Sequence, residues 1–419
     1  FAAYRFIDLY RAIESNVAGQ RNLKVIESDN YEDLSSLIHD EKPSWGSRQI
    51  NRSSRTAWTI GPDEETFLPV DQYWNYDNSE SSSLSTLVIR LKYDKSEEST
   101  ILEIATDDAS VGALLVKQIS NESTAVSIYR GKMLALNFEA GTKDEYGDIE
   151  KPERLRINFN NASELLREDF VVDNVVFDTL KRNITDLYVR RTALRKLGVP
   201  VRRGVLLYGP PGTGKTYACR YICGSLPNTT RIIVTGTALN KVAQIFDLAR
   251  TYQPAIVILE DVDLVFASRD ISLYSSALGD LLDQMDGLPC EDIGIILTTN
   301  SIERMEATIK DRPGRISQCI YFGAPEKVLR AKYIAQYAKD YDYTEADESE
   351  LLTMTKGTTP AFIKEWVYRT VQFASERMSD QEDRITLKTS DFRDAYDEMR
   401  RFTDQESGRI IGFIGSSRQ

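Results

Sequence analysis

The segment Gly209-Pro210-Pro211-Gly212-Thr213-Gly214-Lys215-Thr216 constrains this chain more than any other. The apolar run 204–208 before it predicts a buried strand, and residues 216–225 predict the start of a helix. Glycines in such a loop let backbone N–H groups turn toward a phosphate, where the helix N-terminus adds its positive end. Lys215 is placed to bridge the β- and γ-phosphates, and the Thr216 hydroxyl can bind Mg²⁺. The complete motif disfavours a plain surface turn, so the sequence predicts a site for ATP or GTP.

Two later apolar runs end in polar side chains that suit phosphate chemistry. Residues 255–259 lead into Glu260 and Asp261, and residues 293–299 lead into Asn300. An ATPase needs carboxylates at a strand end to hold hydrated Mg²⁺ and to polarise the attacking water. Asn300 is placed to orient that water against the γ-phosphate. The alternative, a strand that simply meets solvent at its acidic end, is disfavoured by the phosphate loop upstream.

A short turn further along the chain carries two arginines. Arg312 and Arg315 flank the Pro-Gly pair at residues 313–314. Arginines that reach a neighbouring subunit's nucleotide neutralise the charge that develops on the transferred phosphoryl group. Taken alone the pair favours a surface salt bridge, whereas its position after the other motifs favours a catalytic role.

The order of these motifs resembles the AAA clade of the AAA+ ATPases. The resemblance spans roughly residues 165–400 and rests on residues 203–216, 260–261, 281–287, 298–300 and 312–315. It implies an α/β fold, in which a P-loop NTPase core with a parallel sheet is followed by a C-terminal helical lid. It also implies that ATP and Mg²⁺ bind at the subunit borders of a homo-oligomeric ring, usually a hexamer.

The resemblance also implies roles for individual residues. Lys215 and Thr216 would bind phosphate and Mg²⁺, and Asn300 would be the first sensor. Arg312 and Arg315 would act as fingers on the ATP of the next subunit. Ala361 stands where other clades carry a second-sensor arginine. The further nucleotide contacts that the resemblance implies are Tyr217, Val176, Phe177, Gly357 and Ala361.

One departure from the family concerns the acidic pair. Most members end this strand in Asp then Glu, whereas this chain has Glu260 then Asp261. The resemblance then makes Glu260 the Mg²⁺ ligand and Asp261 the water-activating group. The same order recurs in AAA proteins resembling the mitochondrial translocase of the Rieske protein, which are active ATPases. We expect slow to moderate hydrolysis, because displacements near ~1 Å can cost on the order of 10²-fold in rate.

A second departure concerns the loop with which family unfoldases grip a threaded peptide. Residues 235–241 hold no aromatic side chain, and Phe246 in the helix that follows is expected in the core. Leu273 and Tyr274 are candidates to line a channel instead, the alternative being plain surface exposure. The sequence therefore leaves threading open.

Composition disfavours several other classes of protein. The net charge of −12 argues against a role in coating nucleic acid. The only histidine is His39, so a His-Glu-x-x-His zinc-protease motif does not occur. Four cysteines are too few for a disulfide scaffold and fit a reducing, cytoplasmic compartment. No apolar run approaches the roughly 20 residues that span a bilayer, so we expect no membrane segment in this chain.

Changes of pattern along the chain predict four regions. Residues 1–160 mix helical and strand-like runs and suggest an α+β recognition or adaptor domain. Residues 165–322 alternate strands with helices, as expected of a large α/β ATPase subdomain. Residues 323–405 are helical and predict the lid, and residues 406–419 form an apolar tail that we expect to dock on its own or a neighbouring subunit.

Within the first region, alternation of apolar and polar residues predicts several strands, and Asp108 is a candidate cap for a helix. The strand-like runs are 86–92, 100–104, 125–129, 133–138 and 155–159.

These features favour Mg-ATP hydrolysis by a ring that remodels a protein partner bound through residues 1–160. The alternative from another class is a regulatory or scaffold assembly, in which ATP controls assembly and turnover is slow. GTP is disfavoured because Asn240-Lys241 is followed by Val242-Ala243, so no Asn-Lys-x-Asp guanine motif is present there. The sequence does not identify the client protein.

Overall fold

The computed structural model divides the chain into two compact units. The first comprises residues 1–161, 228–238 and 247–255, and the second comprises residues 162–227, 239–246 and 256–419. Two segments of the expected ATPase region therefore group with the N-terminal residues. The structure describes residues 1–18, 23–27, 34, 53–77, 86–143, 149–151, 153–160, 165–199, 203–265, 281, 283–284, 292–303, 316–377 and 385–401.

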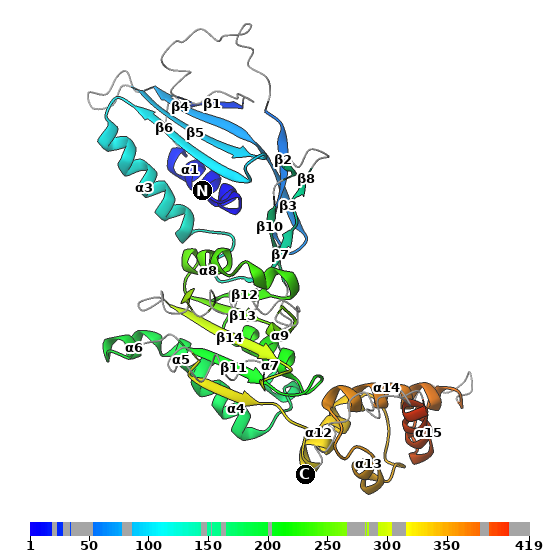
Figure 1. Cartoon of the computed structure of the whole chain (residues 1–419). Helices are drawn as coiled ribbons and strands as arrows, with labels where there is room; N and C mark the ends of the chain where they lie inside the picture. Colours follow the sequence, from blue (N-terminus) through cyan, green and yellow to red (C-terminus); the bar gives the residue numbers. More distant parts are fainter. Residues whose placement is uncertain are drawn as a thin grey trace. The chain divides into compact units, whose positions relative to one another are not determined.

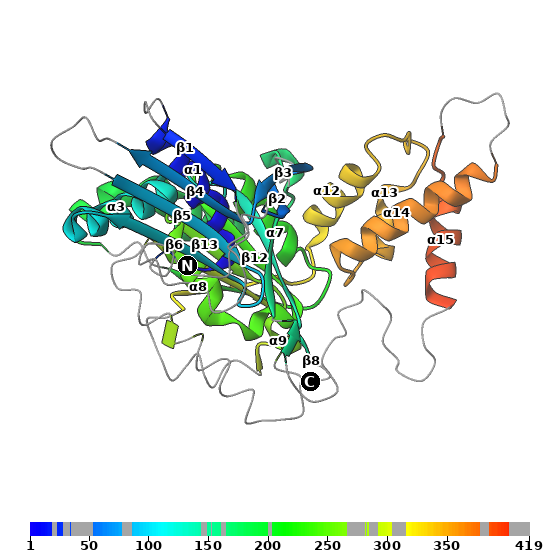
Figure 2. The ribbon, with the colours of Figure 1, turned by 90° about the horizontal axis from the view of Figure 1, so that it is seen from above.

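The first unit contains a four-stranded antiparallel sheet with the strand order β1-β4-β5-β6. Figure 1 and Figure 2 show two helices, α1 (Phe6–Val17) and α3 (Ala109–Ala125), on one face of this sheet. The apolar side chains between sheet and helices form a buried core that includes Phe6, Leu9, Ile13, Trp74, Leu91 and Ile119. The strands are β1 (Leu23–Glu27), β4 (Asp71–Asp77), β5 (Thr86–Asp94) and β6 (Ser99–Thr106).

Four of the five strand-like runs are strands, namely β5, β6, β7 (Met133–Glu139) and β10 (Arg154–Phe159). The prediction of a strand at 125–129 is wrong, because α3 continues to Ala125 and a turn follows. Ile128 is buried in that turn, where its N–H donates to the Asp8 carboxylate at 3.0 Å, so burial rather than strand pairing explains the apolar residues. Asp108 caps α3 as expected, by accepting from the Ser110 N–H at 2.8 Å.

The remaining strands of the first unit form two short hairpins and one three-stranded group. The hairpins are β2 (Arg55–Gly61) with β3 (Glu64–Pro69), and β8 (Thr142–Lys143) with β9 (Ile149–Lys151). In the group, β7 pairs antiparallel with β10 and parallel with β12 (Thr230–Val234). Because β12 follows the phosphate-loop helix in sequence, part of the ATPase region is hydrogen-bonded directly to the N-terminal residues.

A buried polar contact also joins α1 to Tyr252, in the segment 247–255 of the first unit. The Tyr252 hydroxyl donates to the Asp8 carboxylate at 2.7 Å, and both side chains are almost fully buried. Burial raises the pKa of Asp8 above its usual value, although its hydrogen bonds from Ser127, Tyr252 and Ile128 oppose the rise. A carboxylate removed from water depends on such donors, so this contact holds the segment against α1.

The second unit contains parallel strands that carry the predicted motifs. β11 (Gly204–Tyr208) lies between β14 (Ile293–Thr299) and β15 (Gln318–Tyr321) and is parallel to both. β13 (Ala255–Leu259) neighbours β14, and every residue of β13 and β14 is buried. Continuous burial of apolar strands is typical of a parallel sheet covered on both faces. The helices before and between these strands are α4 (Asn174–Leu180), α5 (Asp186–Val189), α6 (Arg191–Lys196), α7 (Lys215–Gly224), α8 (Val242–Thr251) and α9 (Val262–Val265).

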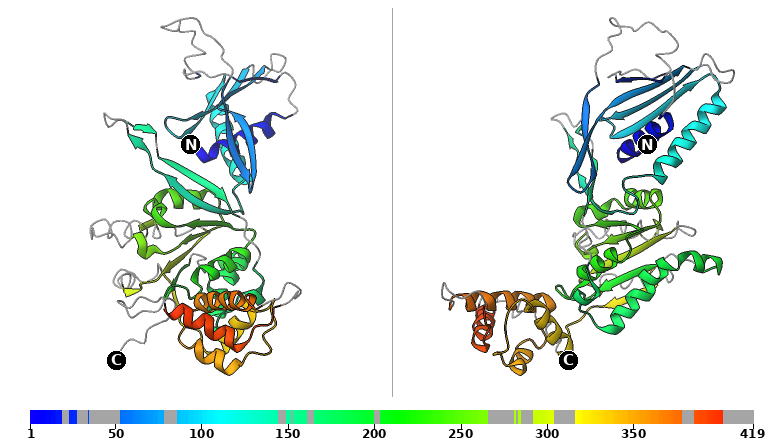
Figure 3. Two further views of the ribbon diagram at one scale, coloured as in Figure 1. Left: turned by 90° about the vertical axis from the view of Figure 1, so that its right-hand side faces the viewer. Right: turned by 180° about the vertical axis from the view of Figure 1, so that it is seen from behind.

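A helical bundle follows the last of these strands, at residues 327–401, and is drawn in orange and red in Figure 3. Its core is centred on Trp366, whose indole N–H donates to the Phe392 carbonyl at 2.9 Å. Thr359 caps α14, and Pro360 occupies its first turn, where a missing N–H costs nothing. The bundle matches the predicted lid, and its helices are α12 (Lys327–Tyr337), α13 (Glu348–Met354), α14 (Pro360–Ser375) and α15 (Thr389–Arg401).

Candidate functional site

The predicted phosphate loop connects β11 to α7, and its three glycines, Gly209, Gly212 and Gly214, all have positive φ. At the first two, a side chain would also meet close neighbours. Gly209 has φ +141°, and a Cβ there would lie 2.1 Å from the Phe322 carbonyl oxygen. Gly212 has φ +75°, and a Cβ there would lie 2.9 Å from the Ala361 Cβ in the lid. The lid also bonds to this loop, because the Ala361 N–H donates to the Gly212 carbonyl at 3.1 Å. The loop is therefore shaped by close contacts with both a strand end and the lid.

The Lys215 ammonium lies at the start of α7 and is hydrogen-bonded on several sides. It donates to the Gly209 carbonyl at 2.7 Å, to the Pro210 carbonyl at 3.0 Å and to the Asn300 side-chain oxygen at 2.7 Å. Burial lowers the pKa of Lys215, and the charges of Asp261 and Asp263 partly offset this. A buried cation beside these groups is suited to bind anionic oxygens.

The polar ends of β13 and β14 meet at the same edge of the sheet, as the sequence predicted. The Asn300 amide donates to the Asp261 carboxylate at 3.1 Å, while the Asn300 backbone N–H donates to Asp263 at 3.0 Å. The Asp261 N–H donates to the Thr298 hydroxyl at 2.9 Å. Lys215, Asn300 and Asp261 thus form one continuous chain of hydrogen bonds.

Asp261 has a backbone conformation that few residues adopt. Its φ is +49°, in the left-handed region, which Asp and Asn occupy more readily than other residues with a side chain. A longer Glu has no such preference. This conformation gives a physical reason for the shorter acid at the second position of the Glu-Asp pair.

Glu260 lies beside the predicted Mg²⁺ ligand Thr216. The two side chains are hydrogen-bonded, and burial raises the pKa of Glu260 above its usual value. A hydroxyl and a carboxylate are hard oxygen donors, the type that Mg²⁺ prefers, and Mg²⁺ commonly takes only one or two protein carboxylates together with phosphate oxygens. The donor set therefore fits this ion. Among the described residues no cluster of three or more His, Cys, Asp or Glu forms a self-contained metal site.

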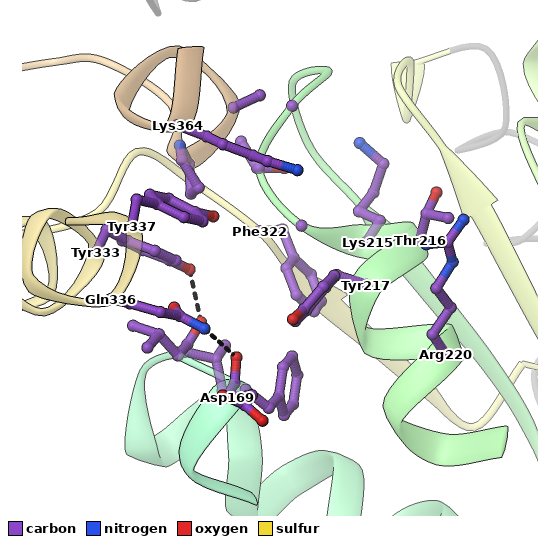
Figure 4. A pocket seen from close by; sticks show the side chains of 18 of the residues that line it. Asp169, Lys215, Thr216, Tyr217, Arg220, Phe322, Tyr333, Gln336, Tyr337 and Lys364 are labelled. Atoms are coloured by element: carbon purple, nitrogen blue, oxygen red, sulfur yellow. Dashed lines mark hydrogen bonds between the residues drawn. The ribbon is translucent and has the colours of Figure 1, made fainter. Parts of the chain in front are cut away.

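A cavity of about 790 Å³ lies between the phosphate loop and the lid, which is a typical size for a nucleotide or cofactor site. Figure 4 shows side chains of α7 and of the lid helix α12 around it. The predicted site residues that line it are Pro211, Gly212, Thr213, Gly214, Lys215, Thr216, Tyr217, Asp261, Asn300 and Ala361.

Five of the predicted nucleotide contacts are not among the residues that line the cavity. Two of them, Gly209 and Pro210, belong to the phosphate loop and accept from Lys215 through their carbonyls. The other three are Val176, Phe177 and Gly357. Val176 and Phe177 are on α4 and do not line the cavity, whereas residues 169–172 just before that helix do. Phe177 instead packs on Phe170, with ring centroids 6.3 Å apart. Gly357 lies before α14 with φ +78° and is not among the lining residues. The predicted arginines Arg312 and Arg315, and the channel candidates Leu273 and Tyr274, lie outside the described residues.

Several residues that line the cavity were not predicted from the sequence. Arg220 follows Thr216 by one helical turn, and its positive charge helps to keep Glu260 ionised. Tyr333 and Tyr337 on α12 are stacked with centroids 6.1 Å apart. Their spacing of one helical turn marks them as neighbours on one helix face, but an apolar lid face alone does not reveal a ligand. The other lining residues of this side are Gln336, Lys339, Asp340, Tyr341, Pro360, Lys364 and Tyr368.

Comparison with known proteins identifies the class of this site. Residues 205–324 match the family described as "ATPase family associated with various cellular activities (AAA)". The chain contains an AAA ATPase domain. The matched residues include the phosphate loop, the acidic pair and Asn300, so the AAA domain carries the motifs predicted from the sequence.

Curated relatives share this region of the chain. The proteasome-activating nucleotidase of Methanopyrus kandleri is 29% identical over 231 residues, which cover 51% of this chain and 52% of that protein. The ATP-dependent zinc metalloprotease FtsH 2 of a Thermoanaerobacter species is 28% identical over 236 residues, 50% of this chain and 46% of the relative. The 26S proteasome regulatory subunit 8 homolog of Schizosaccharomyces pombe is 29% identical over 202 residues, which cover 44% of this chain and 50% of that protein.

The chain thus spans about half the length of the curated relatives it matches. Among the helices that the structure describes, each is too short or too polar to span a bilayer.

Proposed function

We propose that this chain is a Mg²⁺-dependent ATPase that works as a homo-oligomeric ring, usually a hexamer in this family, and remodels a protein bound through its N-terminal unit. The observation that carries the enzymatic part is the hydrogen-bonded chain of Lys215, Asn300 and Asp261 beside the Thr216–Glu260 pair. It places a cation, a water-orienting amide and two carboxylates at one sheet edge. The AAA match supports ATP as the substrate.

Each residue has a distinct part in the proposed reaction. The loop amides and Lys215 bind the β- and γ-phosphates of ATP, and Thr216 with Glu260 would hold Mg²⁺, which neutralises phosphate charge. Asp261 accepts a proton from the attacking water, and Asn300 orients that water in line with the bond to the leaving ADP oxygen. Water oxygen bonds to the γ-phosphorus, and the bond to the ADP oxygen breaks.

The arginines Arg312 and Arg315 complete the proposed site from the adjoining subunit. Guanidinium groups there would neutralise charge on the transferred phosphoryl group, which makes hydrolysis depend on assembly. We place the protein in the cytoplasm because its four cysteines suit a reducing compartment. Its acidic charge favours a protein client over nucleic acid. The Glu-Asp order further suggests kinship with the Rieske-protein translocase group.

One observation favours the second candidate function, a regulatory assembly with slow turnover. The segment at which unfoldases carry an aromatic grip is here the 3₁₀ helix Gly236–Asn240, and Phe246 beyond it is fully buried. The described part of this region thus offers no exposed aromatic for a peptide. Hydrolysis stimulated by an unfolded protein would favour remodelling, and ATP-dependent assembly without such stimulation would favour the scaffold.

The enzymatic proposal is tested with paired substitutions at the strand end. Asp261→Asn keeps the shape and the left-handed backbone preference but removes the proton acceptor. We expect ATP affinity within about threefold of wild type and turnover lowered by roughly 10²-fold or more, which is typical for loss of a general base. Glu260→Gln should instead weaken Mg²⁺-dependent binding itself. Unchanged turnover in Asp261→Asn would reassign the base.

A further inference from the structure

Two side chains of the lid helix α12 donate hydrogen bonds to the segment 169–172, which begins at the last residue of the 3₁₀ helix Arg167–Asp169 and also lines the cavity. The Tyr333 hydroxyl donates to the Val171 carbonyl at 2.6 Å. One turn later, the Gln336 side-chain amide donates to the Asp169 carbonyl at 2.7 Å. Figure 4 shows both bonds at the end of the cavity away from Lys215 and Thr216.

The carbonyl groups of residues 169–171 already accept hydrogen bonds from side chains. Besides the two bonds from the lid, the Phe170 carbonyl accepts from the Arg167 guanidinium at 2.8 Å. Three successive carbonyls are therefore engaged by side chains of this chain. Because one lone pair of each of these carbonyls is already used, a side-chain acceptor that lines the cavity is well placed to accept from a donor on a bound base.

Gln336 supplies a fixed acceptor. Its NH₂ group is the end that contacts the Asp169 carbonyl, since the amide oxygen in that place would repel another oxygen. The amide orientation is thus set by the backbone, and Gln336 lines the cavity. Among the described residues, no donor bonds to its Oε1.

We propose that Oε1 of Gln336 accepts a hydrogen bond from the exocyclic amino group of adenine and so selects ATP over guanine nucleotides. The position occupied by this amino group in adenine carries a carbonyl oxygen in guanine, which would repel Oε1. The stacked rings of Tyr333 and Tyr337 on the same helix provide an aromatic surface beside the base. This inference rests on the proposed function, because it assumes that the cavity binds a nucleoside triphosphate.

The test compares ATP with the triphosphate of purine riboside, which lacks the exocyclic amino group. Binding of each to the full chain with Mg²⁺ is measured by titration calorimetry. We expect wild type to bind ATP about five- to tenfold more tightly than the analogue, the usual worth of one neutral hydrogen bond. In Gln336→Met, which has a similar length but no amide, the two affinities should become equal within about twofold.

Two control variants separate recognition from lid positioning. Tyr333→Phe removes the neighbouring lid bond to Val171 but leaves the Gln336 acceptor, so it should weaken both ligands equally and keep their ratio. Asp169→Asn changes a carboxylate that lines the cavity, as Asp340 also does, and it should also keep the ratio.

Three results would overturn the inference: a wild-type ratio near one, an unchanged ratio in Gln336→Met, or a ratio lost in Asp169→Asn but not in Gln336→Met. Failure of wild type to bind either triphosphate would refute the proposed function instead. The two failures are therefore distinguishable.

Discussion

Adding one methyl group to the phosphate loop should separate the lid from it. A Cβ at Gly212 would lie 2.9 Å from the Ala361 Cβ and 3.1 Å from the Thr359 hydroxyl oxygen. Carbon atoms pack at roughly 3.5–4.0 Å, so the start of α14 must move by about 0.6 Å or more. That movement also stretches the bond from the Ala361 N–H to the Gly212 carbonyl.

Gly357→Ala provides a matched control for the backbone cost. Gly357 has φ +78° and Gly212 has φ +75°, so alanine pays the same left-handed penalty at both, about 1–2 kcal/mol. No atom lies within 4 Å of a Cβ at Gly357. The additional cost at Gly212 is the lid displacement and the weakened hydrogen bond, together about 2 kcal/mol.

The assay measures ATP affinity and the urea midpoint of each variant. Because the lid and the loop both line the cavity, the extra cost of about 2 kcal/mol corresponds to an affinity about 30-fold weaker for Gly212→Ala. Gly357→Ala should lose a similar 1–2 kcal/mol of stability for its backbone, yet bind ATP within about threefold of wild type. Equal affinities in the two variants would refute the contact between loop and lid.

Two further predictions concern the buried contact of the first unit. Tyr252→Phe removes the hydroxyl that donates to Asp8 at 2.7 Å. The unfolding free energy of the first unit, measured by urea denaturation, should fall by about 2 kcal/mol. A loss under about 0.5 kcal/mol would contradict this role of the hydrogen bond. Burial raises the folded pKa of Asp8 above the reference value of 3.8, so the folded state binds the proton more tightly. Protonation of Asp8 therefore contributes its full stabilisation below pH 3.8, and this contribution is lost as the pH rises through the folded pKa. The unfolding free energy of wild type should fall relative to that of Asp8→Asn between pH 3.8 and the folded pKa. A difference between the two that is independent of pH would contradict the assignment.

The phosphate side of the site could be predicted from sequence because its signals are local. The loop Gly209–Thr216 stands between one apolar run and one helix, and the acidic pair and Asn300 end two further buried strands. Parallel strands bring their carboxyl ends to the same edge, so the sequence order already places these groups together.

The lid side of the cavity could not be predicted, because distant segments meet there without a motif. Asp169 and Gln336 are 167 positions apart, and nothing in either sequence neighbourhood indicates their bond. For a related reason the sequence does not show that the residues just before α4 line the cavity while Val176 and Phe177 on that helix do not. The pairing of β7 with β12 could not be predicted either, because an apolar run in the sequence predicts a strand but not the strand it pairs with.

Phosphate release by wild type and by Lys215→Ala, measured side by side, shows whether the site between the phosphate loop and the ends of β13 and β14 hydrolyses ATP. Lys215 joins the loop to Asn300, and its ammonium is the buried cation of the site. We expect steady phosphate release from Mg-ATP by wild type and a rate at least about 10²-fold lower in Lys215→Ala, the scale expected when phosphate-charge stabilisation is removed. Phosphate release at the same rate by both proteins would contradict it.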